Sequence, residues 1–375
     1  MALRGQATIP SDMRVPYLDL SAQHAPIKEE LLAAIGSIID SNAFVLGPGV
    51  EAFETRFAEF CSAKHCAAVN TGTAALHLAL LAYGIGPGDE VITQANTFIA
   101  TVAAIMYTGA RPVLVDVLPP SYTIDVDAVE ASITPRTKAI VPVHLFGQPC
   151  DLDSLRAIAE KHGVTLIEDA SQAHGAVFHG RKIGSTGTAT FSFYPGKNLG
   201  ACGEGGGVVT DDDAIDDRVR LLRNHGSREK YRHEILGYNY RLEGIQGAVL
   251  DIKTRYLDGW TQDRQRVAAA YDALLAGIQR PAFLEDTTSA YHIYPVLVRN
   301  RDEVRARLAE AGIETNVHYP IPCHLQPGYA SLGYAQGTFR HSERMALEEI
   351  SLPIFPEMTP AQVEYVATHL TGAVA

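Results

Sequence analysis

One segment decides the fold: Cys66-Ala-Ala-Val-Asn-Thr-Gly-Thr-Ala-Ala-Leu-His-Leu-Ala-Leu-Leu-Ala-Tyr-Gly-Ile-Gly-Pro-Gly-Asp-Glu-Val-Ile-Thr93. It opens with a short apolar strand, turns at Asn70–Thr73 and continues into a predicted helix at Ala74–Tyr83. The glycine-rich Gly84–Asp89 stops this helix before the next predicted strand, Glu90–Thr93. Short strands that alternate with helices are typical of a parallel sheet covered by helices on both faces.

The same alternation continues toward the C-terminus. Helices are expected at Thr97–Thr108 and Leu152–His162, and strands at Arg111–Asp116, Ala139–Val143, Thr165–Glu168, Phe191–Tyr194 and Gly207–Thr210. Ligands of such sheets bind beyond the carboxyl ends of the strands. The residues just after each strand are therefore the candidates for a functional site.

The pattern changes after a long helical region, Leu242–Ala276. We expect a large domain over residues 1–255 and a small α+β domain over residues 256–375. In the small domain we predict strands at Tyr291–Val298 and Ile313–His318, and helices at Arg301–Ala311, Ser342–Leu347 and Thr359–Leu370.

Composition excludes several classes of protein. Of the 375 residues, 46% are hydrophobic and 20% are charged, as in ordinary globular proteins. The net charge of −12 argues against a nucleic-acid binder that neutralises phosphates. Residues 1–13 lack the apolar core of a signal peptide, and the most apolar stretches are too short to span a bilayer. The five cysteines show no metal-ligand spacing. We expect a cytoplasmic protein without a metal, nucleic-acid or membrane partner.

The turn Asn70–Ala74 is a candidate phosphate site. Gly72 lets the backbone approach an anion, and the N–H groups of Thr73 and Ala74 would point at that anion from the start of the helix. An ordinary helix cap has the same appearance, so this loop alone does not decide between the two.

Two acids end the strand of Ile167–Gln172. A buried carboxylate needs a cationic partner, which the protonated pyridine nitrogen of pyridoxal phosphate (PLP) would supply. We assign this task to Asp169, because alternation along the strand turns Glu168 to the other side. An acid that caps the next segment is the alternative.

Lys197 lies in a Pro-Gly turn after an apolar strand, with no other charge nearby in Thr190–Gly200. Desolvation lowers the pKa of a lysine, which a residue that forms a Schiff base requires. Lys182, in His-Gly-Arg-Lys, is instead expected at the surface. Asn239, in Gly237–Leu242, is either a phosphate donor or a helix N-cap.

Taken in order, these motifs resemble the DegT/DnrJ/EryC1/StrS family of nucleotide-sugar aminotransferases. The resemblance covers nearly the whole chain, in Val15–Leu20, Phe44–Pro48, Gly84–Val91, Ile167–Gln172, Ser192–Lys197 and Gly237–Leu242. It implies the aspartate-aminotransferase-like fold (fold type I of PLP-dependent transferases), in which a large domain with a mixed, mostly parallel seven-stranded sheet carries a small α+β domain.

The resemblance also implies roles for the candidate residues. Lys197 would form the Schiff base with PLP and then move protons, Asp169 would hold the pyridine nitrogen, and Gln172 would contact the phenolic oxygen. Asn239 would reach the phosphate of a neighbouring subunit, so that the active form is at least a homodimer. The phosphate would otherwise be held by Ser192, Thr73 and Ala74, and Phe98 would stack on the ring, although Phe98 is also a plausible core residue.

A proline-held run, Val317–Pro327, resembles members of the family that act at C3 of dTDP-linked 3-keto-6-deoxyhexoses; a rigid interdomain connection is the alternative. The candidate substrate contacts are His318, Tyr319 and His324, together with Tyr194. We expect transamination of a dTDP- or UDP-3-keto-hexose, with glutamate as amino donor and 2-oxoglutarate as its product.

Other functions compete with this hypothesis. Within the family, the alternatives are a 4-aminotransferase for an NDP-4-keto-6-deoxyhexose and a PLP-dependent sugar dehydratase or deaminase. A nicotinamide-dependent oxidoreductase would need a GxGxxG loop, which Asn70–Ala74 does not provide. A regulatory protein without enzymatic activity would have no need of an intact pair of Lys197 and Asp169.

Overall fold

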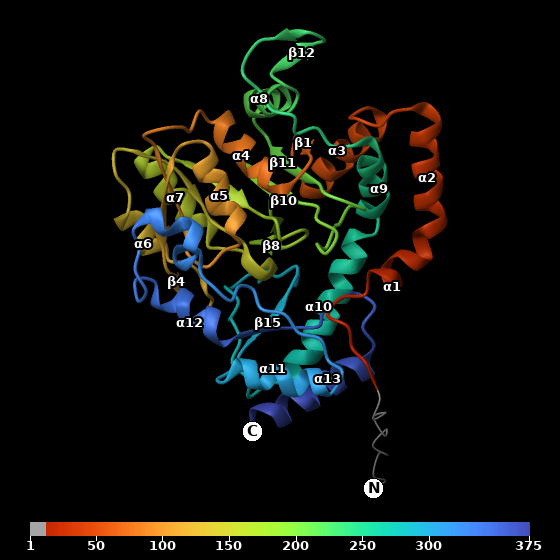
Figure 1. Ribbon diagram of the computed structural model, residues 1–375, viewed down its shortest axis with the longest axis vertical. Coiled ribbons are helices and arrows are strands. Elements are labelled where there is room, and N and C mark those ends of the chain that lie inside the picture. Colours follow the sequence, from red (N-terminus) through yellow and green to blue (C-terminus); the bar gives the residue numbers. More distant parts are fainter. Residues whose placement is uncertain (1–12) are drawn as a thin grey trace.

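In a computed structural model, which describes residues 13–375, the centre of the molecule is a seven-stranded sheet (Figure 1). Strand β11 runs antiparallel to both of its neighbours, whereas the other neighbouring pairs are parallel. This confirms the expected mixed, mostly parallel sheet. The strand order is β1 (His65–Val69), β11 (Gly206–Thr210), β10 (Thr188–Ser192), β7 (Thr165–Asp169), β6 (Thr137–Val141), β2 (Glu90–Gln94) and β3 (Arg111–Val115).

Helices cover both faces of the sheet because alternate strand residues point to opposite sides. Val91 packs in one apolar cluster and its neighbour Ile92 in another. One face packs against α4 (Gly72–Ala82), α5 (Ile99–Tyr107) and α8 (Asp213–Arg223). The other packs against α3 (Pro48–Cys61), α6 (Val126–Ala131), α7 (Leu152–His162) and α9 (Gly244–Thr254).

The small C-terminal unit lies below the sheet in Figure 1 and has its own apolar core. Its elements are α10 (Leu257–Leu274), β15 (Tyr294–Leu297), α11 (Arg301–Glu310), α12 (Arg340–Glu348), β16 (Glu349–Leu352) and α13 (Pro360–Val374). The predicted helical region breaks at Arg255–Tyr256, between α9 and α10. The division at residue 255 stays a prediction, and Val15 from the N-terminal segment packs in this second core.

The structure differs from the sequence predictions in two respects. Ile313–His318 is not a strand: only Ile313 and Asn316 form single bridges, to Val15 and Ser351. The helices α1 (Leu20–His24) and α2 (Lys28–Ser41) were not predicted, and neither were α3, α6 and α8. Most of the segment considered as a signal peptide, residues 1–12, lies outside the described residues. Among residues 13–375, no helix combines the length and apolar character needed to cross a membrane.

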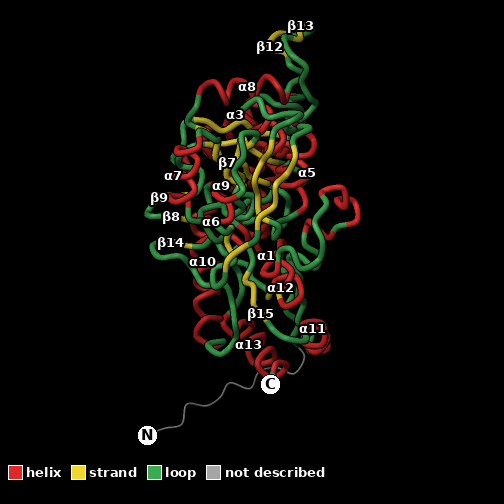
Figure 2. Tube along the Cα trace, turned by 90° about the vertical axis from the view of Figure 1, so that its left-hand side faces the viewer, coloured by secondary structure: helices red, strands yellow, loops and turns green. Residues whose placement is uncertain are grey.

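A small hairpin projects from the far end of the molecule (Figure 2). It consists of β12 (Ser227–Glu229) and β13 (Arg232–His233), and Tyr231 at its tip is 85% exposed. The remaining short strands pair in two further small sheets: β4 (Val117–Leu118) with β5 (Thr123–Ile124), and β8 (Val177–Phe178) with β9 (Arg181–Lys182) and β14 (Thr287–Thr288).

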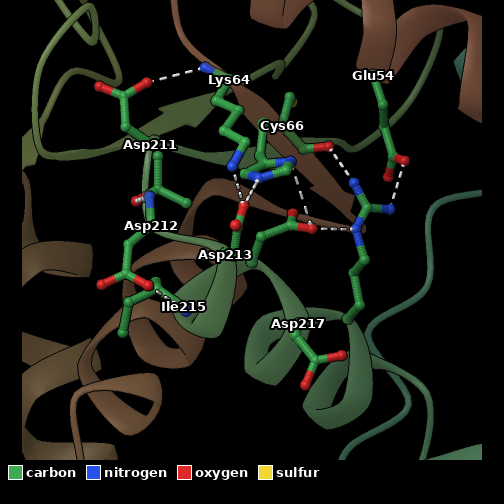
Figure 3. A network of polar contacts seen from close by, with 12 residues as sticks. Glu54, Lys64, Cys66, Asp211, Asp212, Asp213, Ile215 and Asp217 are labelled. Carbon is green, nitrogen blue, oxygen red and sulfur yellow. Dashed lines mark hydrogen bonds and ion pairs between the residues drawn. The ribbon is translucent and has the colours of Figure 1, made fainter.

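Side chains close the β1 edge of the central sheet (Figure 3). The buried Glu54 of α3 accepts a hydrogen bond from the backbone N–H of Ala68 at 2.8 Å and pairs with Arg220 and Arg223 of α8 at 2.7 and 2.5 Å. The two arginines donate in turn to the carbonyl oxygens of Cys66 and Ala68. One buried carboxylate and two guanidinium groups therefore take the place of a neighbouring strand.

Candidate active site

A cavity of about 550 Å³ opens at the carboxyl ends of the parallel strands. Loops after β1, β2, β6, β7 and β10 form one side, and the N-terminal and C-terminal segments close the other. This is the position at which open α/β sheets bind ligands. The lining includes Tyr17, Gly72, Thr73, Phe98, Thr101, Asp169, Gln172, Ser192, Tyr194, Lys197, His292, His318 and Tyr319.

Asp169 is the buried acid of this cavity. Its Oδ2 accepts from the hydroxyl of Thr101 at 2.8 Å, and its Oδ1 accepts from the backbone N–H of Ser171 at 3.1 Å. Among residues 13–375, no cationic side chain forms an ion pair with it. Glu168 faces away and pairs with His144 at 3.1 Å and Arg156 at 3.4 Å. Asp169 therefore presents an unpaired buried carboxylate to the cavity, which favours a cationic ligand group.

Lys197 reaches the same cavity from the turn after β10. Burial lowers the pKa of its amine to about 8, and the nearby charge of Asp169 acts in the opposite direction. A substantial fraction of neutral amine is therefore present close to physiological pH, as a nucleophile or proton acceptor requires. Lys182 differs, since its ammonium pairs with the exposed Asp258 at 2.7 Å.

The turn after β1 lies against Ser192. A Cβ atom on Gly72 would lie 2.6 Å from the Cβ of Ser192, so only glycine allows this close approach. Gly72 and Thr73 line the cavity. Ala74 does not line it, and its N–H donates to the hydroxyl of Thr71 at 3.0 Å, an ordinary cap bond at the start of the helix. The role of Ala74 as an anion donor stays a prediction.

Replacing Gly72 by alanine should lower the free energy of unfolding by about 1–3 kcal/mol, because the added methyl group overpacks against Ser192. Chemical denaturation of the ligand-free protein measures this change. Gly36→Ala in α2 is the matched control, since no atom lies within 4 Å of its added Cβ. Equal stability of the two variants would mean that the Gly72 turn tolerates a side chain.

Gln172, Tyr319 and Phe98 contact one another in the wall of the cavity. The Gln172 Oε1 accepts from the Phe146 N–H at 2.6 Å, and its Nε2 donates to the Tyr319 hydroxyl at 3.0 Å. The Phe98 ring lies 5.3 Å from that of Tyr319 and is 51% exposed. Phe98 is thus a free aromatic face at the cavity and not a core residue.

The remaining predicted residues fall into two groups. Tyr194 and His318 line the cavity. His324 does not: it is 3% exposed, pairs with Glu343 at 3.1 Å and packs on Phe339, and its role as a substrate contact stays a prediction. Asn239 is exposed, accepts from Arg241 at 2.7 Å and lies outside the cavity of its own chain.

Sequence reasoning missed three residues of the site. Thr101 holds Asp169 from within α5, where a polar residue in an apolar helix is a weak signal. His292 lines the cavity and contacts Asn198 through its Nδ1 at 3.2 Å. Tyr17 belongs to a segment noted only as part of the resemblance, and its ring stacks on His318 with centroids 6.1 Å apart.

The sequence and the structure of this chain were compared with those of known proteins. The model of the DegT/DnrJ/EryC1/StrS aminotransferase family matches residues 25–371. The chain belongs to this family. Its fold and its assignment as an aminotransferase are thereby confirmed.

Individual family members are close in sequence and structure. The dTDP-3-amino-3,4,6-trideoxy-alpha-D-glucose transaminase of Streptomyces venezuelae is 47% identical over 353 residues, which cover 93% of each chain. The UDP-N-acetyl-3-dehydro-alpha-D-glucosamine 3-aminotransferase of Acidithiobacillus ferrooxidans is 43% identical and covers 94% of this chain and 96% of its own. The crystal structure of S. venezuelae DesV with a ketimine intermediate superposes with a TM-score of 0.95 at 46% identity, over 96% and 99% of the two chains.

Proposed function

We propose that this aminotransferase uses PLP to transfer an amino group from L-glutamate to C3 of a nucleotide-linked 3-keto-hexose. The observation that carries the proposal is the convergence of Lys197 and Asp169 on one cavity in a chain of this family. PLP chemistry requires two groups from a protein: an amine with a lowered pKa, here Lys197, and a buried carboxylate without a cationic partner, here Asp169.

The cavity residues fit PLP. Asp169, which lacks a cationic partner among the described residues, would hold the protonated ring nitrogen. The space beside Gly72, which a side-chain Cβ would fill, would receive the phosphate, and Thr73 and Ser192 would contact it as well. Gln172 would contact the phenolic oxygen, and the exposed face of Phe98 would cover the ring.

When bound, PLP supplies an electrophilic carbon for amines and a ring that accepts electrons. The chain itself moves the protons. The neutral Lys197 amine would act first as a general base, which takes a proton from the substrate carbon, and then as a general acid, which returns the proton to another atom of the bound substrate and cofactor. Thr101 and the Ser171 N–H keep the Asp169 carboxylate oriented for the ring nitrogen.

The choice of sugar rests on the relatives and on the cavity wall. Both sugar aminotransferases named above carry a 3-amino or 3-dehydro group in their names, one with dTDP and one with UDP. Tyr194, His318 and Tyr319 line the cavity and are our candidate sugar contacts. A 4-keto substrate and a dehydration or deamination reaction are the alternatives that a substrate screen distinguishes.

We further propose that the enzyme works in the cytosol as a homodimer with shared sites. Asn239 is exposed and does not line the cavity of its own chain, which supports a role at the phosphate bound by a partner subunit. Leu236, close to it in sequence, is 87% exposed, and Tyr231 on the projecting hairpin is 85% exposed. Such apolar side chains are typical of an interface.

The test is the absorption spectrum of the purified protein with PLP. A visible band that glutamate removes, and that a dTDP- or UDP-3-keto-hexose restores, supports the proposal and names the nucleotide. Restoration by a 4-keto sugar alone would contradict the C3 assignment. Absence of a bound-cofactor band after addition of PLP would contradict the proposed cofactor.

Asp169→Asn should keep PLP bound but lower turnover by about 10²-fold, because a neutral amide does not hold the ring nitrogen in its protonated form. The rate of the glutamate reaction, followed by absorbance, measures the loss. Asp258→Asn removes an exposed acid on α10 and should leave this rate unchanged. Wild-type turnover in the Asp169→Asn variant would exclude the assigned role of Asp169.

A further inference from the structure

A chain of hydrogen bonds runs from the cavity wall into the core of the small unit. The His318 Nδ1 lies 2.7 Å from the Ser351 Oγ, which lies 2.5 Å from the Glu349 Oε1. The other carboxyl oxygen of Glu349 accepts from the backbone N–H of His318 at 2.7 Å. Both Glu349 and Ser351 belong to β16, and they hold His318 through its backbone and its ring.

Glu349 is an unusual acid because it is fully buried. Among the described residues it forms no ion pair; its close polar neighbours are Ser351 and the His318 N–H. Burial raises its pKa to about 8, although these hydrogen bonds and the charges of Arg301 and Arg305 act in the opposite direction. The carboxyl group therefore keeps its proton at neutral pH.

We propose that Glu349 is a positioning residue of the aminotransferase: through Ser351 it keeps the ring proton of His318 on Nε2, so that this nitrogen donates a hydrogen bond to an oxygen of the sugar substrate. The inference rests on the proposed function and deepens it. An ionised Glu349 would accept from the Ser351 hydroxyl across the 2.5 Å contact. With the proton on Glu349 we infer the opposite direction: the carboxyl O–H donates to Ser351, the hydroxyl of Ser351 donates to Nδ1, and Nε2 remains protonated.

The same chain reverses when one proton leaves. Once Glu349 is ionised, the Ser351 hydroxyl donates to the carboxylate and accepts from the His318 Nδ1–H. The proton that is lost to solvent is then the one on Nε2, and this nitrogen becomes an acceptor. Because a sugar carbonyl oxygen is itself an acceptor, the contact between the two is lost.

Other titratable and charged groups surround this chain. Burial lowers the His318 pKa to about 4, and the charge of Lys197, which lines the same cavity, is the second cause. The charge of His318 is one of the causes that lower the pKa of His292. Tyr17 from the N-terminal segment lies near Glu349 and the buried Arg264, and its hydroxyl interacts with Ser351. All of these groups remain in a Glu349 variant, so a comparison of pH profiles isolates the contribution of Glu349.

The first experiment compares the wild type with Glu349→Gln in the sugar half-reaction. A glutamine donates to Ser351 and accepts from the His318 N–H at every pH, so it imitates the protonated acid. We expect similar kcat/KM near neutral pH and, well above pH 8, a wild-type value that is lower than that of the variant by roughly tenfold, the value of one hydrogen bond. Superimposable profiles, or a loss in the variant already at neutral pH, would overturn the proposal.

The second experiment uses Ser351→Ala, which interrupts the chain. We expect kcat/KM for the keto-sugar to fall roughly tenfold at neutral pH, with the glutamate half-reaction within about threefold of wild type. Ser342→Ala is the matched control: its buried hydroxyl also bonds to an acid, Asp116 at 2.7 Å, but this pair does not include His318 or another residue that lines the cavity. Equal losses in both half-reactions, or in both variants, would show a general structural effect and overturn the proposal.

These measurements separate the two levels of the hypothesis. If the wild-type protein with PLP does not react with glutamate, the proposed function itself fails. If the glutamate reaction proceeds and the keto-sugar is aminated, but Glu349→Gln and Ser351→Ala behave as the wild type, only the role of Glu349 fails.

Discussion

Lys197→Ala is expected to lower the overall transamination rate by roughly 10⁴-fold or more, because it removes both the nucleophilic amine and the proton carrier of the cavity. The fold should remain intact. The amine lines the cavity, desolvation lowers its pKa while the charge of Asp169 acts in the opposite direction, and no hydrogen bond on which the fold depends is lost. Single-turnover absorbance with glutamate measures the loss, and thermal unfolding verifies the fold.

Lys182→Ala is the matched control for this prediction. It removes a lysine of the same chain whose ammonium pairs with an exposed acid and lies 3.6 Å from the centroid of the Phe60 ring. Turnover should be unchanged, and the expected effect on stability is below about 1 kcal/mol. Retained turnover in the Lys197→Ala variant, with Lys182→Ala also active, would require another amine to carry the reaction.

Glu54→Ala should lower the free energy of unfolding by about 3–5 kcal/mol, the effect of leaving buried charge without its partner. Arg223 is 6% exposed and would lose its carboxylate, and the Ala68 N–H would lose its acceptor. Arg220 retains Asp216 at 2.7 Å, so we expect Arg223 to account for most of the loss. Chemical denaturation of the cofactor-free protein gives the free energy.

Two further variants define the origin of this effect. Glu59→Ala removes an exposed acid of the same helix and should change the free energy of unfolding by less than about 0.5 kcal/mol. Glu54→Gln keeps an acceptor for the Ala68 N–H but removes the charge. A loss in Glu54→Gln close to that of Glu54→Ala assigns the cost to the charge of the arginines, whereas a loss below about 1 kcal/mol in both would mean that water reaches these groups.

The sequence predicted the sheet and its cavity because their signals are local. Apolar strands followed by glycine or polar turns identify β1, β2, β7 and β10, and the residues of the cavity follow these strands directly. Alternation along β7 was enough to place Asp169 and Glu168 on opposite sides. The prediction for Lys197 likewise depended only on its immediate neighbours.

What the sequence did not reveal depends on contacts between distant residues. His324 was grouped with His318, but the short 3₁₀-helix Cys323–Leu325 and the pair with Glu343 turn its ring away from the cavity. Ile313–His318 has β-branched residues but lacks a neighbouring ladder to complete a strand. Thr101 and Ser351 act through partners 68 and 33 residues away, a separation that no local pattern encodes.

The closure of β1 by Glu54, Arg220 and Arg223 also has a consequence for how copies of the enzyme meet. An edge strand with free N–H and C=O groups is a template for the strand of another molecule and thus for aggregation. Here the carbonyl oxygens of Cys66 and Ala68 and the N–H of Ala68 are already bound by side chains. The sheet therefore cannot be extended from this side without breaking buried ion pairs, so this edge is protected against pairing with a strand of another molecule.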